Sequence, residues 1–490
     1  MSEQKSMADP EQRGAFGAAA DHAELKSPPN ACGSAESRWR ALGCFLLMLA
    51  AIQLTLGQKI RLSQWELFAQ KDAGVAEGVA WLHGRLDLPP LVHEELDWNY
   101  PPLTQDPSSP THRLHDTAYY PPTGKIYNVF PPLVSILTVI LSPLHRWLLD
   151  GRADLWLQTP YVLLVFWPLP IVGFLVFRRR TGDSAWAALW TLAWMGGTAV
   201  LPTLNQAGHG WLGGIDHVVS QVGLLILAAD CLGKQRIWPG LIGLLISTYT
   251  RQMTFLYGLP LLWIALRRGR GEESSPVWDV RRFLLCAAGL GVIAAPLLTL
   301  NYLKFGHPLD FGYRYIYVGR ESEPMGRRCV EYGTFSTHFI PENLYYMNLA
   351  PPQIGEASLA GVQLSSANPY GTSLWITTPL ALWVFIAFRR WWKERNVRIL
   401  MLGTLPVIAG LVCYHSPGFM EVGHSRFALD FLPIWLVVVA PHTRGRWRTW
   451  FTLGCVAWSL LYFQAIVPDE PIRRGPAPQA ALVRMDHGEV

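Results

Sequence analysis

The sequence HDTAYYPPTGKIYNVFPP, from His115 to Pro132, closes a long polar stretch and leads directly into an apolar run. The polar stretch begins at about Lys59 and lies between two strongly apolar regions. It is rich in carboxylates and aromatic side chains, whereas almost everything after it is apolar. This pattern predicts a membrane protein that does its chemistry on a long polar loop following its first helix.

The composition supports this prediction. Half of the 490 residues are hydrophobic and only 16% are charged, whereas a soluble domain usually has about a quarter charged residues. The 22 Trp and 37 Pro residues are typical of interfacial aromatic belts and broken membrane helices. The net charge of +5 is small, and no basic stripe interleaved with aromatic residues indicates nucleic acid as a partner.

The N-terminal region sets the expected sidedness. Residues 1–37 are polar and lack the apolar core of a signal peptide, so we predict a disordered cytoplasmic tail. Arg38 and Arg40 precede the first apolar helix, 41–57. Because basic residues favour the cytoplasmic side, the N-terminus is expected inside and the loop 59–132 outside.

The basic clusters further along predict how the chain is threaded. If both 133–149 and 160–177 crossed the membrane, the arginines at 178–180 would lie outside. We therefore expect 133–149 to enter the membrane without crossing it, which leaves about eleven spans. The other expected helices are 184–203, 213–233, 237–250, 253–267, 282–301, 371–388, 397–414, 426–441 and 447–464.

The predicted fold class is all-α, a polytopic transmembrane helical bundle with two long outward-facing loops that carry juxtamembrane helices. The loops are 59–132 and 302–370, and the transmembrane domain covers 38–466. Residues 467–490 are expected to form a flexible tail.

Three carboxylates of the first loop are the candidate catalytic residues: Asp72, Asp116 and Glu77. A carboxylate at a membrane surface can act as a general base on an acceptor hydroxyl, or hold a divalent cation against a phosphate. Taken singly, each is most simply a solvated loop charge. Asp116 stands among aromatic residues where the chain returns to the bilayer, and 70–83 could be an amphipathic helix on the membrane.

Three arginines are the candidate phosphate ligands: Arg251, Arg314 and Arg426. A guanidinium group matches the geometry of a phosphate. The simpler interpretations are a snorkelling side chain for Arg251 and an i,i+4 ion pair with Asp430 for Arg426. Asp216 and His217 are either functional intramembrane residues or interfacial ones.

Several soluble-enzyme motifs are missing from the sequence. There is no GxxxxGK[ST] loop, no GxGxxG after a strand and no HExxH. A DxD pair is also absent, which argues against a nucleotide-sugar transferase with a soluble catalytic domain.

A series of short motifs follows in order along the chain. They are Leu82-His83-Gly84-Arg85-Leu86, Asp116-Thr117-Ala118, Gly124-Lys125-Ile126-Tyr127, Phe130-Pro131-Pro132, Thr250-Arg251, Asn301-Tyr302, Phe311-Gly312-Tyr313 and Ser425-Arg426-Phe427-Ala428-Leu429-Asp430. Over roughly residues 40–465, this arrangement resembles the GT-C superfamily of polytopic glycosyltransferases. The resemblance is to bacterial members near the dolichyl-phosphate-mannose mannosyltransferases and aminoarabinose transferases.

The resemblance implies transfer of a sugar, with inversion, from a polyprenyl-phosphate donor to a lipid, glycan or protein acceptor. It places the activity on the outer face of the inner or plasma membrane. An acid of the first outer loop would activate the acceptor, which favours Asp72 or Asp116 ahead of Glu77. Arg251, Arg314 and Arg426 would hold the donor phosphate, and no cofactor is predicted beyond a possible divalent cation. The alternative is a non-catalytic or transport-type membrane protein that binds a polyprenyl-linked glycan.

Overall fold

The computed structural model describes most of the apolar part of the chain. The described residues are 38–56, 67–68, 72–88, 117–148, 156–157, 159–208, 213–268, 277–321, 324–351, 357–359, 362–364, 372–415 and 426–463. The predicted tails 1–37 and 467–490, and Asp116 with most of its loop, lie outside these residues.

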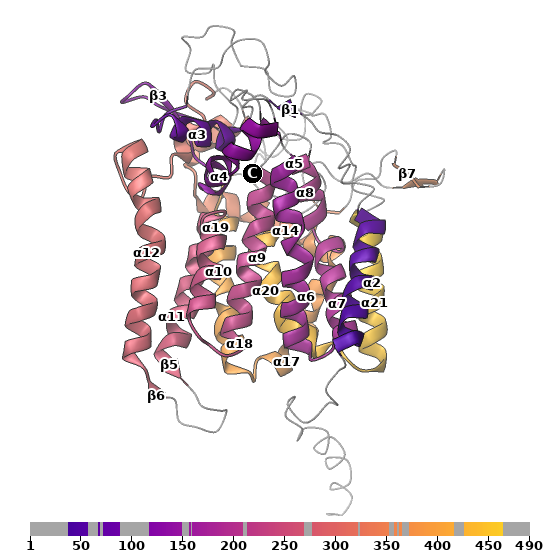
Figure 1. Cartoon of the computed structure of the whole chain (residues 1–490). Coiled ribbons are helices and arrows are strands. Elements are labelled where there is room, and N and C mark those ends of the chain that lie inside the picture. Colours follow the sequence, from indigo (N-terminus) through magenta and orange to yellow (C-terminus); the bar gives the residue numbers. More distant parts are fainter. Residues whose placement is uncertain are drawn as a thin grey trace, which may run out of the picture.

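The described chain is mostly helical, and its longer helices run side by side as a bundle (Figure 1). The first part of the bundle comprises α2 (Arg38–Leu56), α5 (Thr159–Phe166), α6 (Pro168–Thr181), α7 (Ser184–Gly196), α8 (Val200–Gly208), α9 (Gly213–Cys231), α10 (Trp238–Thr248), η3 (Gln252–Tyr257), α11 (Gly258–Leu266) and α12 (Val280–Phe305). The second part comprises α15 (Leu374–Thr377), η6 (Pro379–Leu382), α16 (Trp383–Ile386), α17 (Phe388–Trp391), α18 (Arg395–Leu402), α19 (Thr404–Val412), η7 (Arg426–Asp430), α20 (Leu432–Val439), η8 (Ala440–His442) and α21 (Arg446–Leu461).

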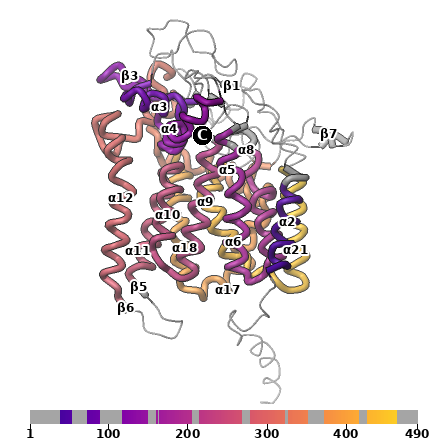
Figure 2. Tube along the Cα trace, in the orientation of Figure 1, coloured from indigo at the N-terminus to yellow at the C-terminus, as the bar shows by residue number. Residues whose placement is uncertain are grey.

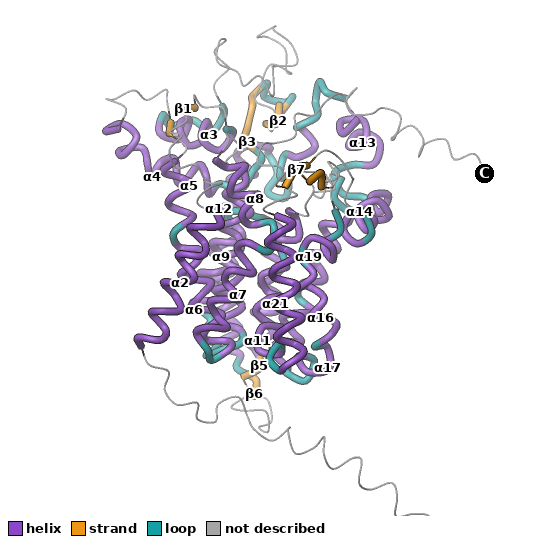
Figure 3. Tube along the Cα trace, turned by 90° about the vertical axis from the view of Figure 1, so that its right-hand side faces the viewer, coloured by secondary structure: helices purple, strands orange, loops and turns teal. Residues whose placement is uncertain are grey.

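Shorter elements from the two polar loops cover one end of this bundle. They are α3 (Ala73–Leu82), β2 (Thr117–Tyr120), β3 (Lys125–Asn128), α4 (Leu133–Leu148), η4 (Tyr313–Tyr315), α13 (Pro324–Tyr332), η5 (Thr337–Phe339) and α14 (Ile340–Asn348). We call this the loop end. In Figure 1 and Figure 3, α4 lies beside α3 across this end rather than among the bundle helices.

The opposite end carries short connections rich in arginine, and we call it the arginine end. Figure 2 traces the chain turning there between α6 and α7 and again near α17. The two-residue strand β5 (Arg267–Arg268), which pairs with β6 (Val277–Trp278), also lies at this end (Figure 1). Both polar loops therefore meet at one end, and the arginines of β5 and α17 lie at the other.

Nearly all the expected apolar helices have counterparts that begin and end within a few residues of prediction, but many are interrupted. The predicted helix 160–177 is broken at Trp167, directly before Pro168 and Pro170 begin α6. Proline lacks the amide hydrogen that a continuing helix would use. By length and composition, three described helical segments could cross a membrane: Gly214–Cys231, Val280–Phe305 and Arg395–Val412.

The described chain is mostly helical, as predicted, and its few strands are short. The described residues contain four two-stranded sheets: β2–β3, β5–β6, β1 (Leu67–Phe68) with β4 (Trp156–Leu157), and β7 (Ala357–Leu359) with β8 (Val362–Leu364). The β2–β3 hairpin turns at Gly124, whose φ of 66° suits a residue without a Cβ. Such brief pairings carry little hydrophobic periodicity, so the sequence pattern did not reveal them.

The core lies around α9 and α20. All eight residues of α20 are buried, as expected for a helix that is apolar on every side. Gly223 of α9 and Gly243 of α10 face each other so closely that a Cβ on either would meet the backbone carbonyl oxygen of the other. By contrast, α12 lies at the edge, with only 22% of its apolar window buried.

Glycines also bring α3 close to α4. A Cβ added at Gly78 would lie 2.5 Å from Cβ of Thr138 and 2.6 Å from the backbone oxygen of Ser135. One turn earlier, a Cβ at Gly74 would lie 2.8 Å from Val134. Because these two glycines stand four residues apart, they form a single face on which α4 rests.

We expect Gly78→Ala to destabilise the protein, because the carbonyl of Ser135 cannot move away as a side chain could. Overpacking of this kind costs about 1–3 kcal/mol. The matched control is Gly43→Ala in α2, where nothing lies within 4 Å of the added methyl group. That control should be neutral or slightly stabilising. Thermal unfolding of the purified full-length protein measures both, and equal midpoints would contradict the close α3–α4 contact.

Candidate functional site

Asp72 is the N-cap of α3 at the loop end. Its Oδ1 accepts hydrogen bonds from the backbone N–H groups of Gly74 at 2.8 Å and Val75 at 3.3 Å. An aspartate in this position satisfies amides that a helix start leaves without partners, and the helix dipole stabilises its negative charge. Asp72 is partly exposed, whereas the helix that follows is buried from Ala73 to Ala80.

Asp72 faces polar residues of the bundle. It lies within electrostatic range of the carboxyl group of Asp216 and the hydroxyl group of Tyr161. Asp216 is in the first turn of α9 and is only 4% exposed. Its Oδ1 is buried and has no hydrogen-bond partner among the described residues. Buried polar atoms without partners are rare in folded proteins, and they are often found where a ligand or water binds.

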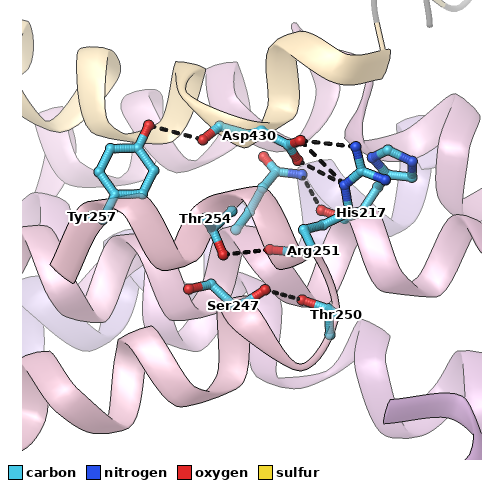
Figure 4. Close-up of polar contacts among 8 residues, drawn as sticks. His217, Ser247, Thr250, Arg251, Thr254, Tyr257 and Asp430 are labelled. Carbon is cyan, nitrogen blue, oxygen red and sulfur yellow. Dashed lines mark hydrogen bonds and ion pairs between the residues drawn. The ribbon is translucent and has the colours of Figure 1, made fainter. Parts of the chain in front are cut away.

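Arg251 lies within electrostatic range of Asp216 and is held by a bidentate ion pair with Asp430 (Figure 4). Its Nε donates to Oδ1 and Oδ2 of Asp430 at 3.1 and 3.2 Å, and its Nη2 donates to Oδ2 at 2.9 Å. Tyr257 also donates to the backbone oxygen of Asp430, at 3.0 Å. The side chain of Asp430 is fully buried, whereas that of Arg251 retains 17% exposure. The pair therefore fixes the guanidinium group at the break between α10 and η3 while leaving part of it accessible.

Phe427 is the centre of the aromatic part of the site. The guanidinium carbons of Arg251 and Arg426 lie 4.9 and 5.3 Å from its ring centroid. The ring of His217 stacks on it at 5.7 Å, and that of Tyr414 lies at 5.9 Å. Two cations on one aromatic ring are stabilised by its negative faces. The arrangement gathers two guanidinium groups around one ring, and one of them, that of Arg251, lies within electrostatic range of Asp216.

The i,i+4 interpretation of Arg426 and Asp430 is wrong. Residues 426–430 form the 3-10 helix η7, in which side chains three apart face the same way and those four apart do not. Asp430 consequently turns to Arg251, far away in the sequence. Arg426 is 8% exposed and keeps its place beside Phe427.

Glu77 lies in a different setting from Asp72. It is fully buried and forms an ion pair with Lys304 of α12, which is 3% exposed. Its Oε2 accepts hydrogen bonds from Asn128 at 2.9 Å and Ser135 at 2.6 Å. Lys304 in turn donates to the backbone oxygen of Asn128 at 2.9 Å. A carboxylate so fully engaged joins α3, β3, α4 and α12, and it is not available to a substrate in this arrangement.

Arg314 lies on the surface of the second loop. Its side chain is 66% exposed, and it pairs with Asp310 at 2.6 Å and Tyr315 at 2.7 Å. No contact joins it to Arg251 or Arg426 among the described residues. Its neighbour Tyr313 is the residue of this turn that lies near Arg251. Of the predicted phosphate ligands, the structure therefore brings Arg251 and Arg426 together and leaves Arg314 apart.

Sequence reasoning missed Tyr414, and it named Phe427 and Tyr313 only as members of motifs. Aromatic residues are frequent throughout this chain, so nothing in the sequence singles out Tyr414 or predicts that Phe427 lies between two arginines. The segment around Arg426 did carry a signal, because two charges flank an apolar run there. No three His, Cys, Asp or Glu side chains of the described residues form a group that could hold a metal ion.

Comparisons with known proteins identified no relatives. The chain matches no protein-family model, no curated protein and no solved structure.

The buried Glu77–Lys304 pair can be tested by a double-mutant cycle. We expect Glu77→Gln or Lys304→Met alone to destabilise the protein by roughly 3–5 kcal/mol, because each leaves an uncompensated buried charge. The double variant should lose much less free energy of unfolding than the two single variants lose together. As a control, Glu342→Gln removes a partly exposed pair with Arg328 and should cost at most about 1 kcal/mol. Chemical unfolding measures all four; additive single effects would contradict coupling between the two charges.

Because His415 is buried, we expect the folded protein to lose stability in mild acid. His415 is buried beside Tyr317, whose hydroxyl group lies 3.2 Å from Nε2. Burial, with a smaller contribution from the nearby charge of Arg328, lowers the pKa of His415 from 6.5 to about 4. Below about pH 6.5 the unfolded chain therefore binds a proton that the folded chain does not, so stability falls as the pH drops from 6.5 towards 4. His415→Gln should flatten this part of the profile, measured by unfolding midpoints between pH 7.5 and pH 4.5; an unchanged slope would contradict the assignment.

Proposed function

We propose that this protein is a membrane glycosyltransferase that moves a sugar, with inversion, from a polyprenyl-phosphate donor to an acceptor at the loop end. The proposal rests on the motif resemblance together with one observation. That observation is the placement of Asp72 at the start of α3, at one end of an apolar bundle and within electrostatic range of Asp216, which is itself within range of Arg251. In this proposal the bundle lies in the inner or plasma membrane, and the loop end faces outward.

The proposed reaction begins at the carboxylate of Asp72. A carboxylate oxygen of Asp72 would take the proton from an acceptor hydroxyl group as the hydroxyl oxygen attacks the anomeric carbon of the sugar. The bond from the anomeric carbon to the phosphate oxygen breaks as the new glycosidic bond forms on the opposite face. The configuration therefore inverts, the proton resides on Asp72, and the electron pair of the broken bond leaves with the polyprenyl phosphate.

Arg251 would stabilise the leaving phosphate. Asp430 occupies Nε and Nη2, so these contacts hold the guanidinium plane in place without engaging Nη1. A preorganised cation stabilises developing negative charge without having to reorient during the reaction. Arg426, on the same aromatic ring, supplies a second positive charge. The apolar surface of the bundle suits a lipid-linked donor, whose polyprenyl chain would remain in the bilayer.

The decisive variant is Asp72→Asn. Asparagine caps a helix about as well as aspartate, so this change removes the charge but keeps the start of α3. Loss of a general base lowers the rate by about 10²–10⁴-fold, and we expect a drop in that range with an unchanged unfolding midpoint. The measurement is transfer of labelled hexose from synthetic polyprenyl-phosphate hexoses by the full-length protein in liposomes.

The control variant is Asp87→Asn at the same end of the molecule. Asp87 pairs with Arg85 at 2.7 Å and Lys125 at 3.6 Å outside the site, so transfer should match that of the unmodified protein. Transfer by Asp72→Asn at the unmodified rate would overturn the role of Asp72. Tight binding of the polyprenyl-phosphate hexoses without transfer by the unmodified protein would favour the non-catalytic or transport-type alternative.

A further inference from the structure

Three arginines gather at the arginine end, at the opposite end of the bundle from Asp72. Arg267 follows the last turn of α11, and Arg395 and Arg398 lie in the first turn of α18. Helix α11 packs against both α18 and β5, and α18 and β5 both lie in the lower part of Figure 1. Arg395 and Arg398 are three residues apart and share a helix face. Arg267 and Arg398 are both close enough to Arg395 for their like charges to act on it.

The positive charge of this group is not neutralised by the described residues. None of the three arginines forms an ion pair with a described acid, and the buried atoms Nε of Arg267 and Nη2 of Arg395 have no hydrogen-bond partner there. The adjacent acid, Glu394, is engaged elsewhere, with Arg180 at 2.7 Å and His442 at 3.4 Å. Like charges held together at a partly buried position destabilise a fold unless an anion binds between them.

Aromatic rings hold two of these guanidinium groups in place. Arg267 lies over Trp263 and Trp278, at 5.0 and 4.6 Å from their ring centroids. Arg398 lies over Trp392 at 5.6 Å. The three tryptophans are themselves 45%, 56% and 37% exposed. Exposed tryptophans at the end of apolar helices are typical of the headgroup level of a bilayer.

We propose that Arg267, Arg395 and Arg398 bind the phosphate group of an anionic phospholipid headgroup. Guanidinium groups match phosphate oxygens in charge and geometry. The flanking tryptophans and the exposed apolar residue Leu259 on α11 favour a lipid over a soluble anion, since they would contact the acyl chains and glycerol. Basic pockets between helices at a membrane surface bind anionic headgroups in this way. The site is independent of the proposed glycosyl transfer.

The test compares unfolding midpoints of the full-length protein in neutral detergent, with and without added lipid. Arg395→Gln is the main variant, since glutamine has nearly the helix propensity of arginine. In detergent alone, its midpoint should lie above that of the unmodified protein, because repulsion is relieved. With phosphatidylglycerol, the unfolding midpoint of the unmodified protein should rise more than that of the variant. The difference between the two midpoints should therefore become smaller or change sign. Phosphatidylcholine, which has no net charge, should produce little shift in either protein.

The control is Arg389→Gln, at an exposed position of α17 at the same end. In detergent alone, the unfolding midpoint of this variant should equal that of the unmodified protein. With phosphatidylglycerol, its midpoint should rise nearly as much as that of the unmodified protein. Lipid retention by native mass spectrometry gives a second measurement, in which Arg395→Gln and Arg398→Gln should each bind phosphatidylglycerol about five-fold more weakly. If Arg395→Gln does not fold, Arg398→Gln decides the outcome in both measurements.

Three results would overturn the proposal. The first is a full phosphatidylglycerol shift in the folded Arg395→Gln or Arg398→Gln variant. The second is an equal shift with phosphatidylcholine, which would indicate a general effect of lipid. The third is the same stabilisation by inorganic phosphate without lipid, which would identify a soluble anion as the ligand.

Discussion

The buried ion pair between Glu77 and Lys304 is the interaction on which the loop end depends. It forms only when α3, β3, α4 and α12 are all in place, because Asn128 and Ser135 complete the hydrogen bonds of the carboxylate. Either charge left alone in that setting would carry a large desolvation cost. The pair therefore couples the docking of α3 to the assembly of the bundle, and through α3 it sets where Asp72 lies.

A second buried pair, Arg251 with Asp430, organises the site below α3. Its two residues come from places where helices are interrupted, the break between α10 and η3 and the 3-10 helix η7. Such interruptions let charged side chains converge inside an otherwise apolar bundle. The glycines of α9, α10 and α3 allow the helices around these breaks to approach closely. Close packing of helices and local breaks in them therefore both contribute to a polar site at the margin of an apolar core.

The two ends of the molecule differ in how their charges are arranged. At the loop end, Glu77 and Asp430 are each neutralised by a basic residue from another element. At the arginine end, Arg267, Arg395 and Arg398 lie near one another with aromatic partners but no acid among the described residues. Charges neutralised within the chain stabilise the fold, whereas uncompensated ones favour an external ligand. Both proposed ligands carry a phosphate group, but they would bind at opposite ends of the bundle.

The sequence by itself determined the helices, because apolar runs and prolines act on the local conformation of the chain. Nearly all the helices end within a few residues of the predicted positions. The sequence also identified Asp72 and Arg251 as charges near apolar segments. The resemblance ranked Asp72 ahead of Glu77, but only the tertiary structure revealed that Glu77 is paired with Lys304 of a distant helix. The tertiary structure alone decided that Asp430 pairs with Arg251 rather than Arg426, since a 3-10 turn changes which side chains share a face. Periodicity depends on local chain geometry, whereas the partner of a buried charge depends on contacts between segments far apart in the chain.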